Sequence, residues 1–166
     1  TEIVRRWAPG RHFFNGYGPA EATVTVSAYL TNPNETDFLK GPPIGRPLAN
    51  VQLYVLDKYL QPTPIGVPGE LHIGGVSVAR GYNDPELTRQ KFISNPFSKE
   101  PEARLYKTGD LVRYLADGNI EFFGRVDNQV KLRGFRIELE EIEAVLTLHP
   151  NVRQTVVLLR EEKSGN

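Results

Sequence analysis

Short runs of β-branched and aromatic residues, separated by turn-forming residues, recur along most of the chain. The clearest runs lie at positions 51–57 and 70–73, and another lies at 23–27. Such residues fit the pleated surface of a strand, whereas the Gly, Pro, Asn and Asp residues between the runs favour turns. The pattern therefore predicts an α+β fold dominated by short antiparallel strands.

A dense group of predicted elements follows in the second half of the chain. Thr108-Gly109-Asp110 separates strand-like runs at 104–106 and 111–115, so we expect a tight turn whose Asp side chain points outward. Asp117-Gly118 predicts a two-residue hairpin turn before the run at 120–123.

The hydrophobic spacing changes near the C-terminal end. After an alternating strand-like segment at 129–134, Leu139, Ile142, Val145 and Leu146 fall on one helical stripe. A further strand is expected at 155–159. This part of the chain is thus predicted to be a partial α/β unit.

Asp84-Pro85 predicts the start of a short helix that runs to about position 92, because Pro is favoured in the first turn. The first ten residues show little pattern.

Composition narrows the class of protein. The chain has 166 residues, and its 20 Lys and Arg residues balance its 20 Asp and Glu residues, so no bulk attraction to nucleic acid or an anionic membrane is expected. No signal peptide is visible, and no apolar run approaches the roughly 20 residues that span a bilayer. The chain has no Cys, which excludes disulfides and thiolate chemistry and suits a cytoplasmic protein. It also has no Met and begins at Thr1, as expected of a piece of a longer protein.

Four segments carry a family resemblance, in the order NGYGPAE (15–21), GELHIGGVSVARGY (69–82), YKTGDL (106–111) and GRVDNQVKLRGFRIELEEIE (124–143). Together they resemble four ordered signature segments of the adenylation domains of nonribosomal peptide synthetases. These domains belong to the adenylate-forming enzymes, with acyl-CoA ligases and luciferases. The resemblance implies that 1–126 is the β-rich, barrel-like C-terminal part of a large subdomain. Residues 127–166 would then be the hinge and the start of a small, incomplete α/β subdomain.

The resemblance assigns nucleotide-binding roles to the first segment. It places the ring of Tyr17 on adenine, Asn15 at the adenine edge and Glu21 on Mg²⁺. These roles suit the residues, because an aromatic face is a base platform and a carboxylate is a hard oxygen ligand. Taken alone, the segment is also compatible with a turn and a solvated Glu. Ala20 stands where the family usually has Thr, so a hydroxyl near the α-phosphate is missing.

Three further residues are implied to contact the nucleotide. Asp110 would accept hydrogen bonds from both ribose hydroxyls, Phe122 would lie beside the nucleotide where Tyr is frequent, and Arg125 would approach ribose or phosphate. Without the resemblance, Asp110 could cap its own turn and Arg125 could form a salt bridge at a strand end.

The remaining implied roles concern the substrate and domain movement. Gly16, Val24 and Thr25 match positions that line the amino-acid pocket. Asp127 matches the hinge, and Lys131 lies on the face that turns toward the active site in the second half-reaction.

The implied reaction has two steps. An amino-acid carboxylate attacks the α-phosphate of ATP to give an aminoacyl adenylate, and a phosphopantetheine thiol on a peptidyl carrier domain then takes the acyl group. The phosphate loop and the Lys that contacts the substrate carboxylate are not in these 166 residues. We therefore expect the chain to need the remainder of the adenylation domain and to be inactive alone.

Two other interpretations remain open from the sequence. One is a fragment of an acyl- or aryl-CoA ligase of the same superfamily, and the other is a non-catalytic β-rich interaction module.

Overall fold

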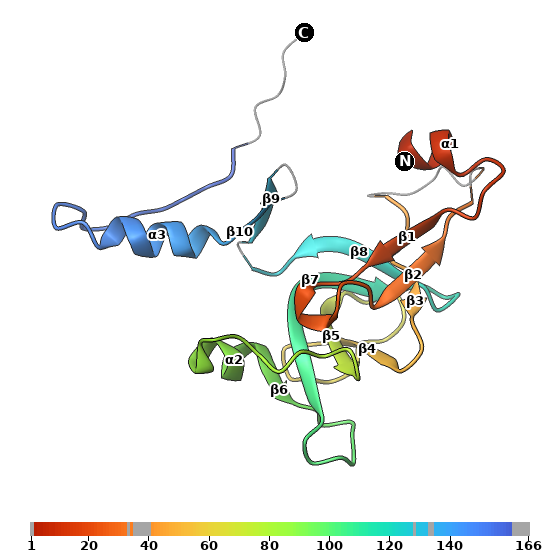
Figure 1. Cartoon of the computed structure of the whole chain (residues 1–166), viewed down its shortest axis with the longest axis horizontal. Helices are drawn as coiled ribbons and strands as arrows, with labels where there is room; N and C mark the ends of the chain where they lie inside the picture. The colour runs from red at the N-terminus through yellow and green to blue at the C-terminus, as the bar shows by residue number, and fades with distance from the viewer. Residues whose placement is uncertain (1, 33, 35–40, 128, 133–134, 161–166) are drawn as a thin grey trace, which may run out of the picture. The chain divides into compact units, whose positions relative to one another are not determined.

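The computed structural model describes residues 2–32, 34, 41–127, 129–132 and 135–160. It divides into two compact units, Thr1–Val126 and Asp127–Asn166 (Figure 1). Helices and antiparallel strands both occur, so the α+β prediction is confirmed. The family resemblance implies a boundary between two subdomains at the same position, and that assignment stays a prediction.

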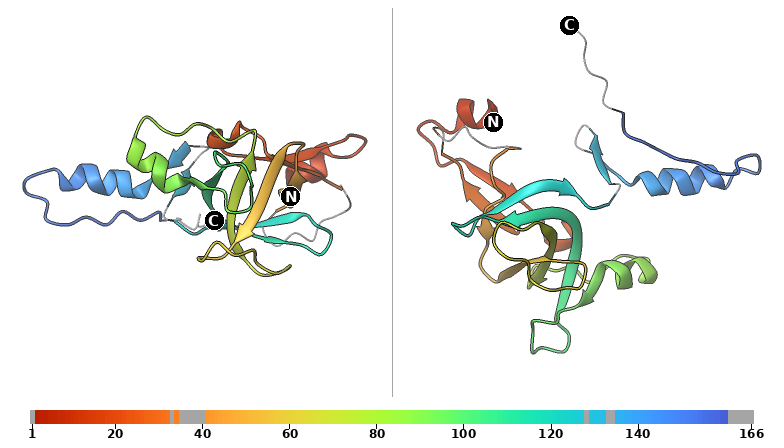
Figure 2. Two further views of the ribbon diagram at one scale, coloured as in Figure 1. Left: turned by 90° about the horizontal axis from the view of Figure 1, so that it is seen from below. Right: turned by 180° about the vertical axis from the view of Figure 1, so that it is seen from behind.

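A five-stranded antiparallel sheet forms the centre of the first unit. Its strands are β4 (Val51–Leu56), β5 (Gly69–Gly75), β6 (Phe92–Ser94), β7 (Arg104–Tyr114) and β8 (Ile120–Arg125). The order is β4-β5-β7-β6, and β8 also pairs with β7. The right-hand view of Figure 2 shows the long curved β7 and its partner β8.

A smaller antiparallel sheet contains β1 (Phe14–Tyr17), β2 (Ser27–Leu30) and β3 (Arg46–Pro47). It connects to the larger sheet through a bridge between Gly45 and Ile120. Ile44 N donates to Ile120 O at 2.8 Å, and Ile120 N donates to Gly45 O at 2.9 Å. The expected barrel-like end therefore takes the form of two open sheets joined at this bridge.

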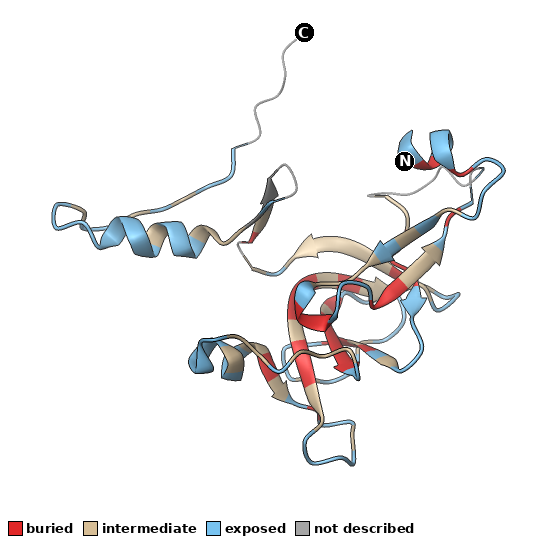
Figure 3. Ribbon diagram, viewed as in Figure 1, coloured by how far each residue is buried: buried red, intermediate tan, exposed pale blue. Residues whose placement is uncertain are grey.

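The hydrophobic core lies between these sheets and is built from alternate positions of the strands. Leu71 and Ile73 on β5, together with Tyr106 and Val112 on β7, are almost fully buried. Figure 3 shows the buried residues gathered on the central strands. Burial of these apolar side chains is the main stabilising contribution to the unit.

The short helix predicted after Asp84 is confirmed. Helix α2 spans Pro85–Lys91, and the Asp84 side chain accepts hydrogen bonds from Glu86 N at 2.8 Å and Leu87 N at 3.2 Å. These bonds satisfy amide groups that the first turn leaves without intrahelical partners. Helix α1 (Glu2–Trp7) was not predicted, because its residues show little periodicity.

The expected strand at 23–27 is wrong over most of its length. A 3₁₀ turn, η1 (Ala20–Ala22), precedes it, and β2 begins only at Ser27. Thr23 and Val24 have φ of 61° and 69°, in the left-handed region that β-branched residues rarely adopt. Strand propensity is overridden here by the tight path of the loop.

The turn expected at Thr108-Gly109-Asp110 is also wrong, because these residues lie inside the continuous strand β7. Gly109 has φ of 73°, and the pairing of β7 with β5 is irregular at this point. A glycine that predicts a turn can equally occupy a bulge within a strand.

The hairpin at Asp117-Gly118 is confirmed, but its loop is longer than predicted. Leu115 N donates to Asn119 O at 2.8 Å, and Gly118 N donates to Leu115 O at 2.9 Å. Ala116, Asp117 and Gly118 thus form the loop, with Gly118 at φ 83°. A turn followed by one left-handed residue is a common form of three-residue hairpin.

The second unit contains β9 (Val130–Leu132), which pairs antiparallel with β10 (Phe135–Ile137), and helix α3 (Leu139–Thr147). No strand is assigned at 155–159, so that prediction is wrong. Val156 and Leu158 are 71% and 80% exposed, and no described strand pairs with them. A β-prone sequence becomes a strand only where a partner accepts its hydrogen bonds.

The burial of His72 leads us to expect that the first unit is less stable in acid. His72 is 1% exposed, its Nε2 has no hydrogen-bond partner in the described residues, and Tyr54 and Lys107 lie opposite it on β4 and β7. Burial lowers the pKa of His72; the Glu70 carbonyl and carboxylate oppose this shift, and Lys107 adds to it. In the unfolded chain, His72 binds a proton near pH 6.5, whereas in the native chain it does so only at lower pH. The free energy of unfolding therefore falls as the pH drops below about 6.5.

We expect urea denaturation at pH values between 8 and 5 to show this decrease in the free energy of unfolding, by up to about 1.4 kcal/mol per pH unit. His72→Leu removes the titrating group, so its stability should depend less on pH. Parallel curves for the two proteins would contradict the assignment.

Gly16, within β1, and Gly18, in the loop that follows it, differ sharply in the space around them. A Cβ on Gly18 would lie 2.5 Å from the Val24 carbonyl oxygen, whereas a Cβ on Gly16 would lie 3.6 Å from Thr25 Cγ2. We expect Gly18→Ala to lower the free energy of unfolding by about 1–3 kcal/mol through overpacking against backbone. Gly16→Ala, the matched control, should change it by less than about 0.5 kcal/mol. Equal effects in urea denaturation would show that the close approach does not constrain the loop.

Candidate functional site

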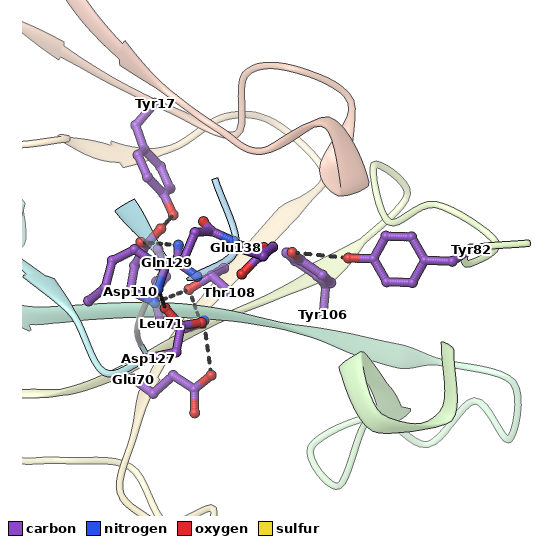
Figure 4. Close-up of polar contacts among 12 residues, drawn as sticks. Tyr17, Glu70, Leu71, Tyr82, Tyr106, Thr108, Asp110, Asp127, Gln129 and Glu138 are labelled. Atoms are coloured by element: carbon purple, nitrogen blue, oxygen red, sulfur yellow. Dashed lines mark hydrogen bonds and ion pairs between the residues drawn. The ribbon is translucent and has the colours of Figure 1, made fainter. Parts of the chain in front are cut away.

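Three predicted site residues meet in one cluster. Tyr17 ends β1, Asp110 lies within β7, and Arg125 ends β8 opposite Asp110. Arg125 Nη1 donates to Asp110 Oδ1 at 2.8 Å. The Tyr17 hydroxyl donates to Asp110 Oδ2 (Figure 4). Segments 93 residues apart in sequence are thereby joined at one carboxylate.

The cluster is largely shielded from solvent. The side chains of Arg125 and Asp110 are only 13% and 11% exposed. Charge-assisted hydrogen bonds are strong in such surroundings, and each charge here offsets the cost of burying the other. Burial, reinforced by the negative charge of Asp110, raises the pKa of Tyr17 far above its ordinary value. Tyr17 therefore remains a hydrogen-bond donor at physiological pH.

Glu21 is buried, which argues against a solvated turn residue. It lies in η1 with 9% exposure. Its Oε1 accepts a hydrogen bond from the Tyr82 hydroxyl at 2.7 Å, and its carbonyl accepts from Ala79 N at 2.8 Å. The Tyr82 hydroxyl also lies 3.5 Å from that of Tyr106 (Figure 4). Burial raises the pKa of Tyr82, and the bonds to Tyr106 and Glu21 raise it further.

Other predicted residues lie around these contacts. The Asn15 side chain donates to the carbonyls of Pro42 and Pro43, at 3.2 and 2.7 Å, so it holds the chain segment that leads to Ile44. Phe122 is half-buried in β8 and packs against the core.

The predicted substrate-pocket residues form a small exposed surface. Gly16, Val24 and Thr25 are all exposed, and the open side of Gly16 faces the Thr25 side chain. The left-handed backbone at Val24 is energetically costly, and such strain is concentrated at functional sites in proteins.

The predicted residues of the second unit are less informative. Asp127 is its first residue and accepts a hydrogen bond from Gln129 N at 3.3 Å. Lys131 lies in β9 opposite Arg136, but its side chain is outside the described part of the structure.

Sequence reasoning missed the residues that hold the predicted ones. Tyr82, Glu70 and Thr108 were given no site role, yet Tyr82 contacts Glu21, and the other two contact the backbone around Asp110. Their position within the signature segments was the only available signal.

Three further observations concern metal groups, cavities and membrane-spanning helices. No group of three or more His, Asp or Glu side chains suited to a metal ion occurs among them. A cavity of about 500 Å³ lies elsewhere on the first unit, lined partly by Asn50, Gln52, Asn95 and Arg104, and no predicted site residue lines it. Within the same residues, none of the helices has the length and apolar character needed to cross a membrane.

Comparisons with known proteins place the chain in a family. A family model described as AMP-binding enzyme matches residues 1–83. A linear gramicidin synthase of Brevibacillus parabrevis is 58% identical over 99% of this chain, which covers 3% of that relative. Phosphinothricin tripeptide synthetase PhsC of Streptomyces viridochromogenes is 53% identical over 98% of this chain, which covers 15% of it. The chain thus spans a small part of these relatives.

Solved structures agree with this placement. PA1221, an NRPS protein containing adenylation and PCP domains, matches with a TM-score of 0.78 and 34% identity over 96% of this chain and 32% of that chain. NpsA-ThdA, an artificially fused adenylation-PCP protein from Klebsiella oxytoca, matches with a TM-score of 0.73 and 37% identity over 90% and 28%. The chain therefore belongs to the family of AMP-binding enzymes, and its resemblance to the adenylation domains of nonribosomal peptide synthetases is confirmed.

Proposed function

We propose that this chain is part of an adenylation domain that activates an amino acid with ATP and loads it onto a phosphopantetheine carrier during nonribosomal peptide synthesis. The meeting of Tyr17, Asp110 and Arg125 at one buried carboxylate carries the proposal. An aromatic ring, an anionic acceptor and a cation are the groups needed for adenine, ribose and phosphate. The peptide-synthetase relatives favour this function over that of a CoA ligase.

Nucleotide binding on this proposal exchanges one partner of Asp110. A ribose hydroxyl takes the place of the Tyr17 hydroxyl on Oδ2, and the Tyr17 ring is then available to adenine. Arg125 remains beside Oδ1, so the buried carboxylate keeps a cationic partner. Phe122 and Asn15 complete the surroundings of the base.

The implied Mg²⁺ fits the site in one limited way. Glu21 is a buried carboxylate, but the described residues around it supply no cluster of further acidic ligands. An ion bound there would be shared between Glu21 and phosphate oxygens, as is common for Mg²⁺ in nucleotide sites. Its chemistry would be to neutralise charge on the phosphates during transfer. Holding Glu21 in place is the task of the Tyr82 hydroxyl.

The two units have separate parts in the proposal. Residues 1–126 are the C-terminal part of the large subdomain, with Gly16, Val24 and Thr25 facing the amino acid. Residues 127–166 begin the small subdomain, with Asp127 as hinge and Lys131 on the face used for thioester formation. The partners are the remainder of the adenylation domain and a carrier domain, like those joined in PA1221. A cytoplasmic location is part of the proposal, since ATP is abundant there.

Nucleotide titration of the complete adenylation domain tests the proposed roles. Asp110→Asn removes charge and half of the acceptor capacity, so we expect ATP to bind about 10-fold or more weakly. Tyr17→Ala should weaken binding by about 1–3 kcal/mol through lost stacking, whereas Tyr17→Phe, which keeps the ring, should not. Asp117→Asn at the exposed hairpin tip is the control, and calorimetry is the measurement. Unchanged affinity in Asp110→Asn and Tyr17→Ala would favour a non-catalytic module.

Activity of the isolated chain tests the expected dependence on other segments. The 166 residues should show no amino-acid-dependent exchange of pyrophosphate into ATP, because the phosphate loop and the Lys that contacts the substrate carboxylate lie elsewhere. The complete domain should show exchange under the same conditions. Exchange catalysed by the purified chain would overturn this expectation.

A further inference from the structure

The backbone that carries Asp110 has lost its regular strand pairing. In the register between β5 and β7, Glu70 lies opposite Leu111, and His72 lies opposite Lys107. Leu71 alone therefore faces the whole segment from Thr108 to Asp110. The amides of this bulge cannot all pair with β5, yet buried amides need partners.

Two side chains supply the missing acceptors. Glu70 Oε1 accepts from Gly109 N at 3.0 Å, and Thr108 Oγ1 accepts from Asp110 N at 2.9 Å. Thr108 Oγ1 also donates to Leu71 O at 2.7 Å, which ties the bulge to β5 (Figure 4). Thr108 is 3% exposed, so this linkage lies inside the fold.

The peptide groups on both sides of Gly109 are held by Glu70 on β5 and by Val126, the residue that follows β8. The Gly109 N–H donates to Glu70, and the Gly109 carbonyl accepts from Val126 N at 2.9 Å. Gly109 has φ of 73°. Because glycine can adopt many backbone conformations, contacts from other residues are needed to hold it in this one. The direction of the following residue, Asp110, depends on this peptide.

We infer that Glu70 is a positioning residue for Asp110: its carboxylate fixes the Gly109 peptide and so sets where the Asp110 oxygens meet the ribose hydroxyls. The inference rests on the proposed nucleotide-binding role of Asp110. Glu70 acts as a hydrogen-bond acceptor at a set reach, not through its charge. A Gln at this position should therefore serve, and a shorter acid should not.

The experiment measures binding of ATP and of 2′,3′-dideoxy-ATP to the complete adenylation domain. Glu70→Ala and Glu70→Asp should weaken ATP binding about 3–10-fold, the effect of one lost hydrogen bond. Glu70→Gln should stay within about 2-fold of the unmodified domain. For 2′,3′-dideoxy-ATP, which lacks both hydroxyls, none of the Glu70 variants should matter.

Glu121→Ala is the matched control. Glu121 is also a partly buried carboxylate between β7 and β8, but it pairs with Arg113, at 2.8 Å from Nη2, and does not touch the bulge. It should leave the affinity for both nucleotides unchanged. Glu70→Asp keeps the charge and most of the side-chain volume. If Glu70→Ala does not fold, the inference is therefore tested with Glu70→Asp.

The outcomes separate this inference from the proposed function. If Asp110→Asn fails to discriminate ATP from the dideoxy nucleotide, the ribose role of Asp110 is wrong, and the inference falls with it. If Asp110→Asn discriminates and neither Glu70→Ala nor Glu70→Asp does, only the positioning role of Glu70 is wrong. Equal weakening of both nucleotides by these two Glu70 variants would also overturn it, because that pattern indicates a general loss of structure.

Discussion

The arrangement of the first unit depends on one buried carboxylate. Asp110 is held by Arg125 on the neighbouring strand and by Tyr17 from the smaller sheet. A carboxylate with so little exposure is tolerated only where a cation and hydrogen-bond donors surround it. The same contacts that make Asp110 tolerable in the fold also bring together an acceptor, a ring and a cation. Stability and the candidate nucleotide site thus use the same three side chains.

In this unit the regular strands form the core, and the irregular backbone segments carry the polar groups of the candidate site. The buried alternation of β5 and β7 provides a rigid core, and the polar groups sit where pairing breaks down. Thr23 and Val24 adopt left-handed conformations beside Glu21, and Gly109 does so beside Asp110. Such conformations persist only when neighbouring contacts determine them, as the bonds from Gly109 to Glu70 and Val126 do. The irregular segments therefore orient Glu21 and Asp110 in directions that a regular strand would not give them.

The second unit differs from the first in how little of its apolar surface is buried. Helix α3 buries none of its described residues, and Val145 on its apolar stripe is 67% exposed. Among the described residues of this unit, helix α3 and the sheet of β9 and β10 offer each other little apolar surface to bury.

The sequence by itself determined the local elements and the family. Runs of β-branched and aromatic residues located β4 and β5, the Asp84-Pro85 pair located α2, and helical spacing located α3. Four ordered motifs identified the chain as similar to adenylation domains. These signals are local in the sequence. Tertiary structure alone decided that 155–159 forms no strand, that Asp110 lies within β7, and that Tyr17 reaches Asp110 across 93 residues. It also revealed Glu70 and Tyr82 as the supports of the predicted residues. These features depend on which partner a backbone or side-chain group finds in space, and local spacing carries no information about such partners.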